Sequence, residues 1–345
     1  MIFKLILLLY LDDLVITVPS QDDVNWIRGL LHDEFEMTDL RPLTVFLGIE
    51  IRRNRQLRRV HISQQQYIPT ILNQFRMSTA VTVSTRADPH VRLTTSSADH
   101  RADQINKERY QSAVGSLMYA MIGTRPDIPF SVSAVSQYST NPGRMHWTAG
   151  RRIFRYLSGT QIQGLNYGRG YCGGYSNADC GSGEDRRSIG GYAFMVHGAA
   201  VSWASKKQPS VALSSTEAEY MSLAQGVKEA LWLGELLSDL GALQHKAEIR
   251  QVQCDNQRAI ALTQNTQYHT RTKHIDIQYH FLRQDIESQS IQLTYCPTHK
   301  MVADIFTKPL LRPQFEKHVL GLGLAPSADH TRDKFEKLKG HERED

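Results

Sequence analysis

Cysteine is scarce in this chain of 345 residues. The four cysteines, Cys172, Cys180, Cys254 and Cys296, form no Cys-x-x-Cys pair. Paired spacing is the usual sign of a disulfide framework or a zinc site, so its absence argues against both. We therefore expect reduced thiols and an intracellular location, in the cytoplasm or the nucleus.

Long hydrophobic runs are also missing. A membrane-spanning helix needs roughly 20 apolar residues, and no stretch of the chain approaches that length. The apolar run over residues 1–9 is short, has no small-residue cleavage site and is soon followed by two aspartates, which argues against a signal peptide. We expect a protein that is neither secreted nor inserted into a membrane.

Neither sign of charge dominates the composition. Lys and Arg number 40 against 35 Asp and Glu, a formal net charge of +5, which permits a polyanionic partner without requiring one. Hydrophobic residues make up 41% of the chain, enough to bury a core, and the length corresponds to about two domains. We find no internal repeat.

The first 160 residues predict short strands followed by helices. Apolar runs on both sides of Asp12 and Asp13 indicate a core β-hairpin, and Ser20-Gln21-Asp22-Asp23 indicates a helix start. The segment 78–106, rich in Ser, Thr, Asp and Arg, predicts a mobile connection. The other expected elements are two strands at 46–51 and 60–62 joined by a basic tip, a helix opened by a capping box at Ser63-Gln64-Gln65-Gln66, and helices at 110–121, 127–138 and 142–157.

From about residue 160 the pattern changes to short strands. Ser214-Ser215-Thr216-Glu217 is a capping box, and the helix behind it has one apolar face. The later residues complete an α/β unit. Its expected elements are an antiparallel meander of strands at 162–167, 174–178, 188–197 and 199–205, a strand to Asp255, a short helix from Gln257, a helix with Ile275, Tyr279, Leu282 and Ile286, a strand at 291–295 and a last helix around Asp304.

The adjacent carboxylates of Asp12 and Asp13 need a physical reason. Between two apolar strands, unpaired carboxylates would protonate or destabilise the site unless a cation compensates them. Two divalent metals held by carboxylates can activate a 3′-hydroxyl and stabilise a leaving pyrophosphate, as nucleotidyl transfer requires. The alternative is a tight turn in which both aspartates face water.

The context favours the metal interpretation. Tyr10-Leu11-Asp12-Asp13 between two hydrophobic strands resembles the YxDD hairpin of reverse transcriptases, and Phe46-Leu47-Gly48-Ile49-Glu50-Ile51 follows as in copia-type retrotransposons. Further stretches resemble signatures of the same family along nearly the whole chain. They are Ser112–Tyr119, Thr124-Arg125-Pro126-Asp127-Ile128, His146-Trp147, Tyr156–Thr160, Ser205-Lys206-Lys207-Gln208-Pro209, Ser214–Tyr220, Arg271–Asp276 and Ala303–Leu310.

This resemblance implies the C-terminal part of a Pol polyprotein, with the end of a reverse transcriptase, a connection and an RNase H domain. A polymerase site needs a further aspartate from an earlier palm strand, and only eleven residues precede Asp12. Asp12 and Asp13 then resemble half of a metal site. We expect no independent polymerase activity.

The resemblance also implies four RNase H positions around two Mg²⁺ ions: Asn177, Glu219, Asp255 and Asp304. The family pattern is Ser-Asp-Ala-Asp, whereas this chain has Ser176-Asn177-Ala178-Asp179, so the position expected to bridge both metals carries a neutral amide. Asp179 points to the same strand face but lies about 6–7 Å further along. We expect it not to replace the missing carboxylate without a shift in register, and the RNase H activity to be impaired.

Other polar residues have two interpretations each. Glu217 is expected to bond the Ser214 amide in the capping box, which leaves Glu219 as the ligand. Packing or hydrogen bonding explains His269, His274 and His280 better than metal binding does. His299, near Asp304 in the sequence, is a weak candidate for a role in product release. The arginines of the basic tip (Arg52, Arg53, Arg58 and Arg59) are candidates to bind nucleic-acid phosphates, with a solvated hairpin tip as the equal alternative. Lys206 and Lys207, in the signature at 205–209, are further candidates.

The sequence therefore predicts an α/β and α+β fold. The expected parts are a partial reverse transcriptase palm at 1–77, a linker and helical connection at 78–160, an RNase H-like mixed-sheet domain at 161–320 and a charged tail at 321–345. The expected function is an impaired Pol product that acts on RNA–DNA hybrids with Mg²⁺. A non-catalytic nucleic-acid-binding module and an unselected transposon remnant stay open as alternatives, and the oligomeric state is open too.

Overall fold

The computed structural model describes residues 5–18, 20–40, 42–95, 106–181, 183–264, 282, 284–288 and 290–327. The chain divides into two compact units, residues 1–47 and residues 48–345. Within the described ranges, none of the helices combines the length and apolar character of a membrane span.

The first unit is small and contains a hairpin and a helix. Strands β1 (Ile6–Tyr10) and β2 (Asp13–Thr17) pair antiparallel, so that Tyr10 faces Asp13. Helix α1 (Gln21–Glu34) begins after Ser20, whose Oγ accepts a hydrogen bond from the Asp23 amide at 3.1 Å, as predicted. The short strand β3 (Val45–Phe46) follows. The expectation of a core hairpin is wrong for the described residues, because Leu9 and Leu11 are 71% and 82% exposed.

The second unit contains a mixed five-stranded sheet with strand order β11-β10-β7-β8-β9. Strand β8 pairs antiparallel with both β7 and β9, whereas β10 pairs parallel with both β7 and β11. This is the mixed sheet expected of the RNase H-like part, and the predicted fold class is confirmed. The strands are β7 (Gly173–Ala178), β8 (Ile189–Val196), β9 (Ala199–Lys207), β10 (Gln251–Cys254) and β11 (Gln292–Tyr295).

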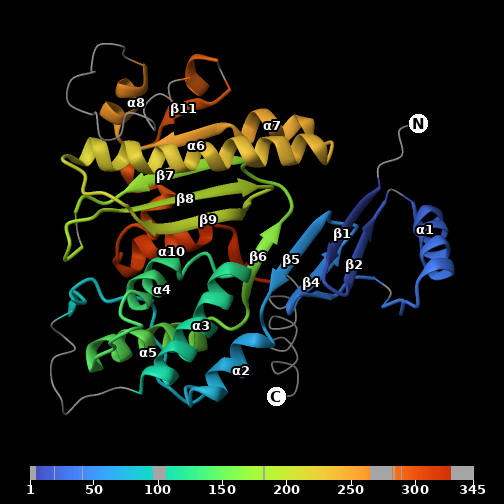
Figure 1. Ribbon diagram of the computed structural model, residues 1–345, viewed down its shortest axis with the longest axis horizontal. Coiled ribbons are helices and arrows are strands. Elements are labelled where there is room, and N and C mark those ends of the chain that lie inside the picture. The colour runs from blue at the N-terminus through green and yellow to red at the C-terminus, as the bar shows by residue number, and fades with distance from the viewer. Residues whose placement is uncertain are drawn as a thin grey trace, which may run out of the picture. The chain divides into compact units, whose positions relative to one another are not determined.

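Helices cover both faces of this sheet. Helix α6 (Ser215–Asp239) packs on β7 and β8 from one side, with α7 (Leu243–Ile249), and the 3₁₀ helix η5 (Val302–Phe306) packs on the same strands from the other (Figure 1). Strand β8 shows the alternation that this requires. Phe194 joins the core under α6, whereas its neighbours Ala193 and Met195 join the core on the opposite side.

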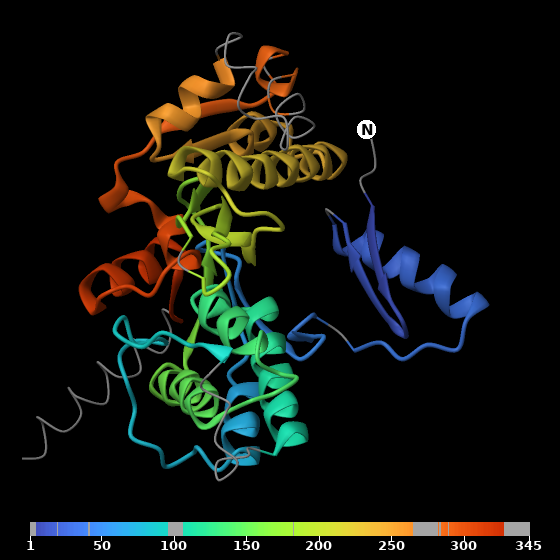
Figure 2. The same cartoon turned by 60° about the vertical axis from the view of Figure 1, so that its left-hand side comes forward.

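A helical layer adjoins the η5 side of the sheet. It contains α2 (Tyr67–Gln74), α3 (Lys107–Gly123), α4 (Pro129–Ser136) and α5 (Arg144–Gly159), and both views show it on the side away from α6 (Figures 1 and 2). One hydrophobic core joins these helices to β8, β9 and η5. The helical connection and the mixed sheet therefore share buried side chains.

A second sheet completes this unit, and it corrects the predicted meander. Strand β6 (Gln163–Tyr167) pairs with β5 (Arg59–Ser63) and with β12 (Leu324–Pro326), and β5 pairs with β4 (Ile49–Asn54). β6 was expected to pair with the following strand. Its partners lie about a hundred residues or more away along the chain, so the local pattern could not reveal them.

Several helix starts and ends differ from the expectation. Helix α2 has Gln66 at its N-cap position, and its amide donates to the carboxylate of Glu50 at 2.7 Å, so a residue of the preceding hairpin replaces the expected capping box at Ser63. Helix α5 starts after Gly143 rather than at Pro142. The expected helix around Asp304 is the 3₁₀ helix η5, and α10 (Arg312–Gly321), which was not expected, follows it.

The remaining segments are the short helices α8 (Gln257–Gln264) and η4 (Thr298–Lys300) and the connection after α2. Residues 78–95 of the predicted mobile connection form no helix or strand, yet Arg86 is 2% exposed, donates to the Ile305 carbonyl and lies 4.8 Å from the Phe315 ring centre. This part of the connection is therefore packed. The predicted helix with Ile275 and Tyr279 lies mostly outside the described residues.

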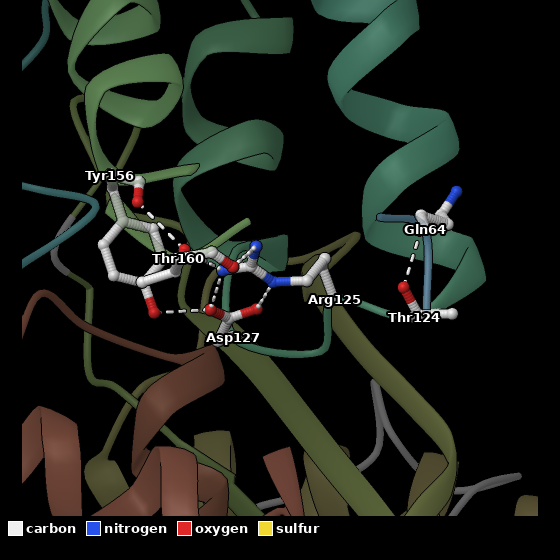
Figure 3. Close-up of polar contacts among 6 residues, drawn as sticks. All are labelled: Gln64, Thr124, Arg125, Asp127, Tyr156 and Thr160. Atoms are coloured by element: carbon white, nitrogen blue, oxygen red, sulfur yellow. Dashed lines mark hydrogen bonds and ion pairs between the residues drawn. The ribbon is translucent and has the colours of Figure 1, made fainter. Parts of the chain in front are cut away.

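A buried polar network fixes the turn between α3 and α4 (Figure 3). Arg125 donates to both carboxylate oxygens of Asp127, at 2.9 and 2.6 Å, and to Thr160 Oγ1 at 2.8 Å. The Tyr156 hydroxyl also donates to Asp127, at 2.5 Å. Burial alone would raise the pKa of the Asp127 carboxyl, but Arg125 and Tyr156 outweigh burial and lower it. The Arg125–Asp127 pair is thus a charged structural link between helices.

Candidate active site

The two polymerase-like aspartates lie at the exposed tip of the first hairpin. Leu11, with a φ of 51°, and Asp12 form the turn, and Asp13 opens β2. Both aspartates are exposed. Among the described residues, the side chains close enough to share a metal ion are Glu219, Cys254 and Asp255. Asp12 and Asp13 are not part of this group.

The four RNase H-like positions come from four elements that meet at one edge of the mixed sheet. Asn177 is near the carboxyl end of β7, and Asp255 directly follows the carboxyl end of the parallel strand β10. Parallel strands place their carboxyl ends at the same edge. Glu219 comes from the first turns of α6 on one face, and Asp304 from η5 on the other.

The Asn177 side chain contacts Asp304, and the backbone directly after it contacts Glu219. Its Nδ2 donates to Asp304 Oδ1, and the next amide, that of Ala178, donates to Glu219 Oε2 at 2.9 Å. Asn177, Glu219 and Asp304 are all buried. The structure thus brings together the positions that the resemblance implied, with an amide at the centre.

Glu219 and Asp255 form the open half of this cluster. Ligand atoms of Glu219, Cys254 and Asp255 all lie within 4.8 Å of one another. Burial, with the nearby charge of Asp255, raises the pKa of Glu219 to about 9, so the ionised carboxylate is disfavoured unless a cation compensates it. Burial also raises the pKa of the Cys254 thiol, to about 12. A protonated thiol is a poor ligand for a hard cation, whereas a cation that binds at Glu219 would favour its ionised form, so the two carboxylates are the candidate ligands.

Asp304 forms the other half, and its oxygens already have donors. Lys308 Nζ lies 2.8 Å from Oδ1, the oxygen that also accepts from Asn177, and Gln314 Nε2 donates to Oδ2 at 3.4 Å. Burial raises the pKa of Asp304, and Lys308 opposes that rise. The donor set therefore fits one divalent cation at Glu219 and Asp255, but it does not fit a second one bridged to Asp304. Sequence reasoning missed Lys308 and Gln314, although the spacing of Asp304 and Lys308 is that of an i,i+4 pair.

Asp179 is held away from this cluster. The Ile189 amide donates to its Oδ1, and its own amide donates to the Ile189 carbonyl at 3.0 Å. Strand β7 keeps a regular register with β8 at Asn177 and Ala178. Strand β7 therefore shows no register shift that would bring Asp179 into the cluster.

Glu217 and the other candidates lie as follows. The carboxylate of Glu217 accepts from the Leu213 amide at 2.7 Å, and its amide donates to the N-cap residue Ser214 at 3.2 Å, a role at the helix start. His299 is exposed on η4. Lys207 pairs with Asp185 at 3.0 Å, whereas Lys206 is exposed. The candidates His269, His274 and His280 lie outside the described residues.

The arginines of the basic tip line a separate groove of about 1220 Å³ between β4, β5, β6 and β12. Among the residues that the structure describes, no carboxylate lines it. Two of its arginines, Arg55 and Arg169, were not among the sequence candidates. The arginines that line it are Arg52, Arg53, Arg55, Arg58, Arg59 and Arg169.

Comparisons with known proteins show which family the sequence belongs to. A family model described as reverse transcriptase (RNA-dependent DNA polymerase) matches residues 2–89. The Pol polyprotein of the tobacco transposon TNT 1-94 is 41% identical over 92% of this chain, which covers 24% of that polyprotein. The chain thus spans about a quarter of the length of this relative.

Two further matches differ in strength. The putative transposon Ty5-1 protein of Saccharomyces cerevisiae is 31% identical over 64% of this chain and 72% of its own length. The solved structure of an RNase H1 isolated from compost matches 43% of this chain and 98% of its own chain, at 14% identity. The TM-score is 0.31, which is too low to support an argument. On the sequence matches, the chain belongs to the family of copia-type retrotransposon Pol proteins, and its residues 2–89 match their reverse transcriptase.

Proposed function

We propose that residues 161–320 form an RNase H-like domain whose cleavage of RNA in RNA–DNA hybrids is impaired. The observation that carries this proposal is the buried amide of Asn177 between Glu219 and Asp304. Glu219 and Asp255 would hold Mg²⁺ through their carboxylates. A bound divalent cation would polarise the scissile phosphate and activate water.

The chain's own residues have distinct tasks in this proposal. Thr298 donates to Asp255 Oδ2 at 2.8 Å and orients that carboxylate. The Ala178 amide does the same for Glu219. Asn177 donates a hydrogen bond to Asp304 where an aspartate would supply a charge, so the cluster has one negative charge fewer than the family pattern.

The test is cleavage of a labelled RNA strand in a hybrid, with Mg²⁺ or with a chelator, and with duplex RNA as the substrate control. We expect slow cleavage of the hybrid that needs Mg²⁺ and is lost in Asp255→Asn. Asp285→Asn, which changes a carboxylate outside the cluster, is the matched control and should cleave like the native chain. Cleavage that survives the chelator or Asp255→Asn would contradict the proposal.

A second candidate function is a nucleic-acid-binding module, and the arginine groove favours it. Six arginines form a positive surface with no carboxylate among its described lining residues, and phosphate backbones bind such surfaces with a strong salt dependence. In this proposal the groove holds the backbone of a hybrid or of another nucleic acid. Lys206, exposed on β9, would add to the binding, whereas Lys207 is already paired with Asp185.

The groove can be tested by hybrid binding measured over a range of salt concentrations. Arg55→Gln with Arg169→Gln should weaken binding and lower the slope of log affinity against log salt by about 2, because each lost phosphate contact removes roughly 0.9. The matched control is Lys107→Gln with Arg151→Gln, two exposed cations on α3 and α5. An equal effect of both double variants would show that only net charge matters.

A further inference from the structure

Lys308 is placed by the backbone directly over the carboxylate of Asp304. Its ammonium lies 2.8 Å from Asp304 Oδ1, and the Asp304 side chain is fully buried while that of Lys308 is 42% exposed. The Thr307 and Lys308 amides both donate to the Asp304 carbonyl, at 3.2 and 3.4 Å. The backbone at the end of η5 therefore places the Lys308 side chain next to the Asp304 carboxylate.

Three donors satisfy the oxygens of Asp304. Lys308 and Asn177 donate to Oδ1, and Gln314 donates to Oδ2. A carboxylate has about four acceptor positions, and N–H groups aimed at an oxygen leave little room for a cation on the same side. Asp304 is thus compensated by residues of the chain itself.

The charges lead to the same view. Glu219, Asp255 and Asp304 supply three carboxylates, and Lys308 supplies one ammonium. With Glu219 ionised, as a bound cation favours, the uncompensated charge is two, which a single divalent ion balances. An aspartate at position 177 would add a third uncompensated charge and favour a second ion.

We propose that Lys308 acts as the built-in counter-ion of Asp304, so that the cluster holds one divalent cation, on the Glu219 and Asp255 side, instead of two. This inference rests on the proposed function only in taking the cluster as a divalent-cation site. Lys308 is a positioning residue in this view. It pairs with Asp304, which also accepts a hydrogen bond from Asn177.

The first test is a Mn²⁺ titration of the full native chain, followed by the loss of the free-ion spectroscopic signal and made without nucleic acid. We expect one bound Mn²⁺ that is lost in Asp255→Asn. Two bound ions in the native chain, both lost in Asp255→Asn with Asp304→Asn, would overturn the inference. This measurement needs no Lys308 variant, so it stays decisive if such a variant fails to fold.

The second test is thermal unfolding of Lys308→Met with a chelator and with millimolar Mg²⁺. We expect Tm to fall by a few degrees in the chelator, because Asp304 stays buried without its cation, and Mg²⁺ to recover most of the loss. Lys308→Arg should behave like the native chain. The matched control is Lys300→Met, which removes an exposed lysine of η4 and should show no larger Mg²⁺ response than the native chain.

The outcomes separate this inference from the proposed function. Equal Mg²⁺ stabilisation of Lys308→Met and the native chain would overturn the role of Lys308, whatever the cleavage assay gives. One bound Mn²⁺ together with no hybrid cleavage under any condition would contradict the proposed function and leave the counter-ion role standing.

Discussion

Asn177 and an aspartate have nearly the same shape, so the effect of this position is electrostatic. A buried amide can orient Asp304 by donating a hydrogen bond, and the structure shows that bond. The same amide cannot balance a dication, because it offers a neutral oxygen. At the residue scale, the loss of one charge changes the number of cations that the site can hold.

His318 gives the residue scale a pH-dependent prediction. Burial, together with the cations Lys317, Lys308 and Arg86, lowers the pKa of His318 to about 4. The unfolded state then binds a proton below pH 6.5 that the folded state does not, so the free energy of unfolding should fall as pH drops from about 6.5 to about 4, by at most about 3 kcal/mol. Denaturant unfolding at several pH values should show a flatter dependence for His318→Gln. The exposed His299→Gln is the control, and equal slopes in all three proteins would contradict this account.

The Arg125–Asp127 pair gives a second prediction at this scale. Asp127→Asn leaves a fully buried guanidinium beside a neutral partner, which should lower the free energy of unfolding by about 3–5 kcal/mol. Asp88→Asn breaks the partly exposed pair with Arg152, at 3.6 Å, and should cost about 1 kcal/mol or less. Urea unfolding of both variants is the measurement. Similar losses would mean that burial of the first pair adds nothing.

Helix α6 shows how an element positions the site. Ser214 caps it, Glu217 accepts from the Leu213 amide at its start, and Glu219, two residues further along, accepts from the Ala178 amide of β7. The capping-box pattern predicted this start correctly. The pattern near Ser63 failed because Glu50, from a neighbouring strand, accepts the bond at the start of α2, and local sequence does not show which distant carboxylate will be near.

Glu217→Gln tests the division of roles on α6. The change keeps the size of the side chain and weakens one hydrogen bond, so we expect a loss of about 1 kcal/mol or less in the free energy of unfolding and unchanged hybrid cleavage. Glu219→Gln should instead abolish cleavage. If the two variants lose cleavage equally, Glu217 and Glu219 do not have the separate roles assigned to them.

At the scale of the whole molecule, one core spans the predicted boundary at residue 160. Ser133 on α4 donates to the Ser205 carbonyl, Trp203 donates to the Met121 carbonyl at 3.0 Å, and β6 pairs with β5. Composition changes near 160 because helices give way to strands, and it therefore predicts the elements well. It says little about packing, since contacts between distant segments leave no local mark. Leu322 and Leu324 are likewise buried although the predicted tail begins at 321.

The domain division remains a prediction, and fragments can test it. Residues 161–320 contain the whole mixed sheet, so we expect the fragment to fold. It should unfold at a lower urea concentration than residues 48–327, because it lacks α2–α5 and the partners of β6. Equal midpoints would show that the helical layer adds no stability to the sheet.

The rate of hybrid cleavage by Asn177→Asp, compared with the native chain at the same Mg²⁺ concentration, tests the central claim most directly. Restoring the fourth carboxylate beside Glu219, Asp255 and Asp304 should raise the rate by orders of magnitude, and Asp255→Asn in the same chain should cancel the gain. Asp179→Asn, a carboxylate-to-amide change two residues along, should leave the native rate unchanged. A native chain already as active as Asn177→Asp would contradict the account, because another group would then supply the missing charge.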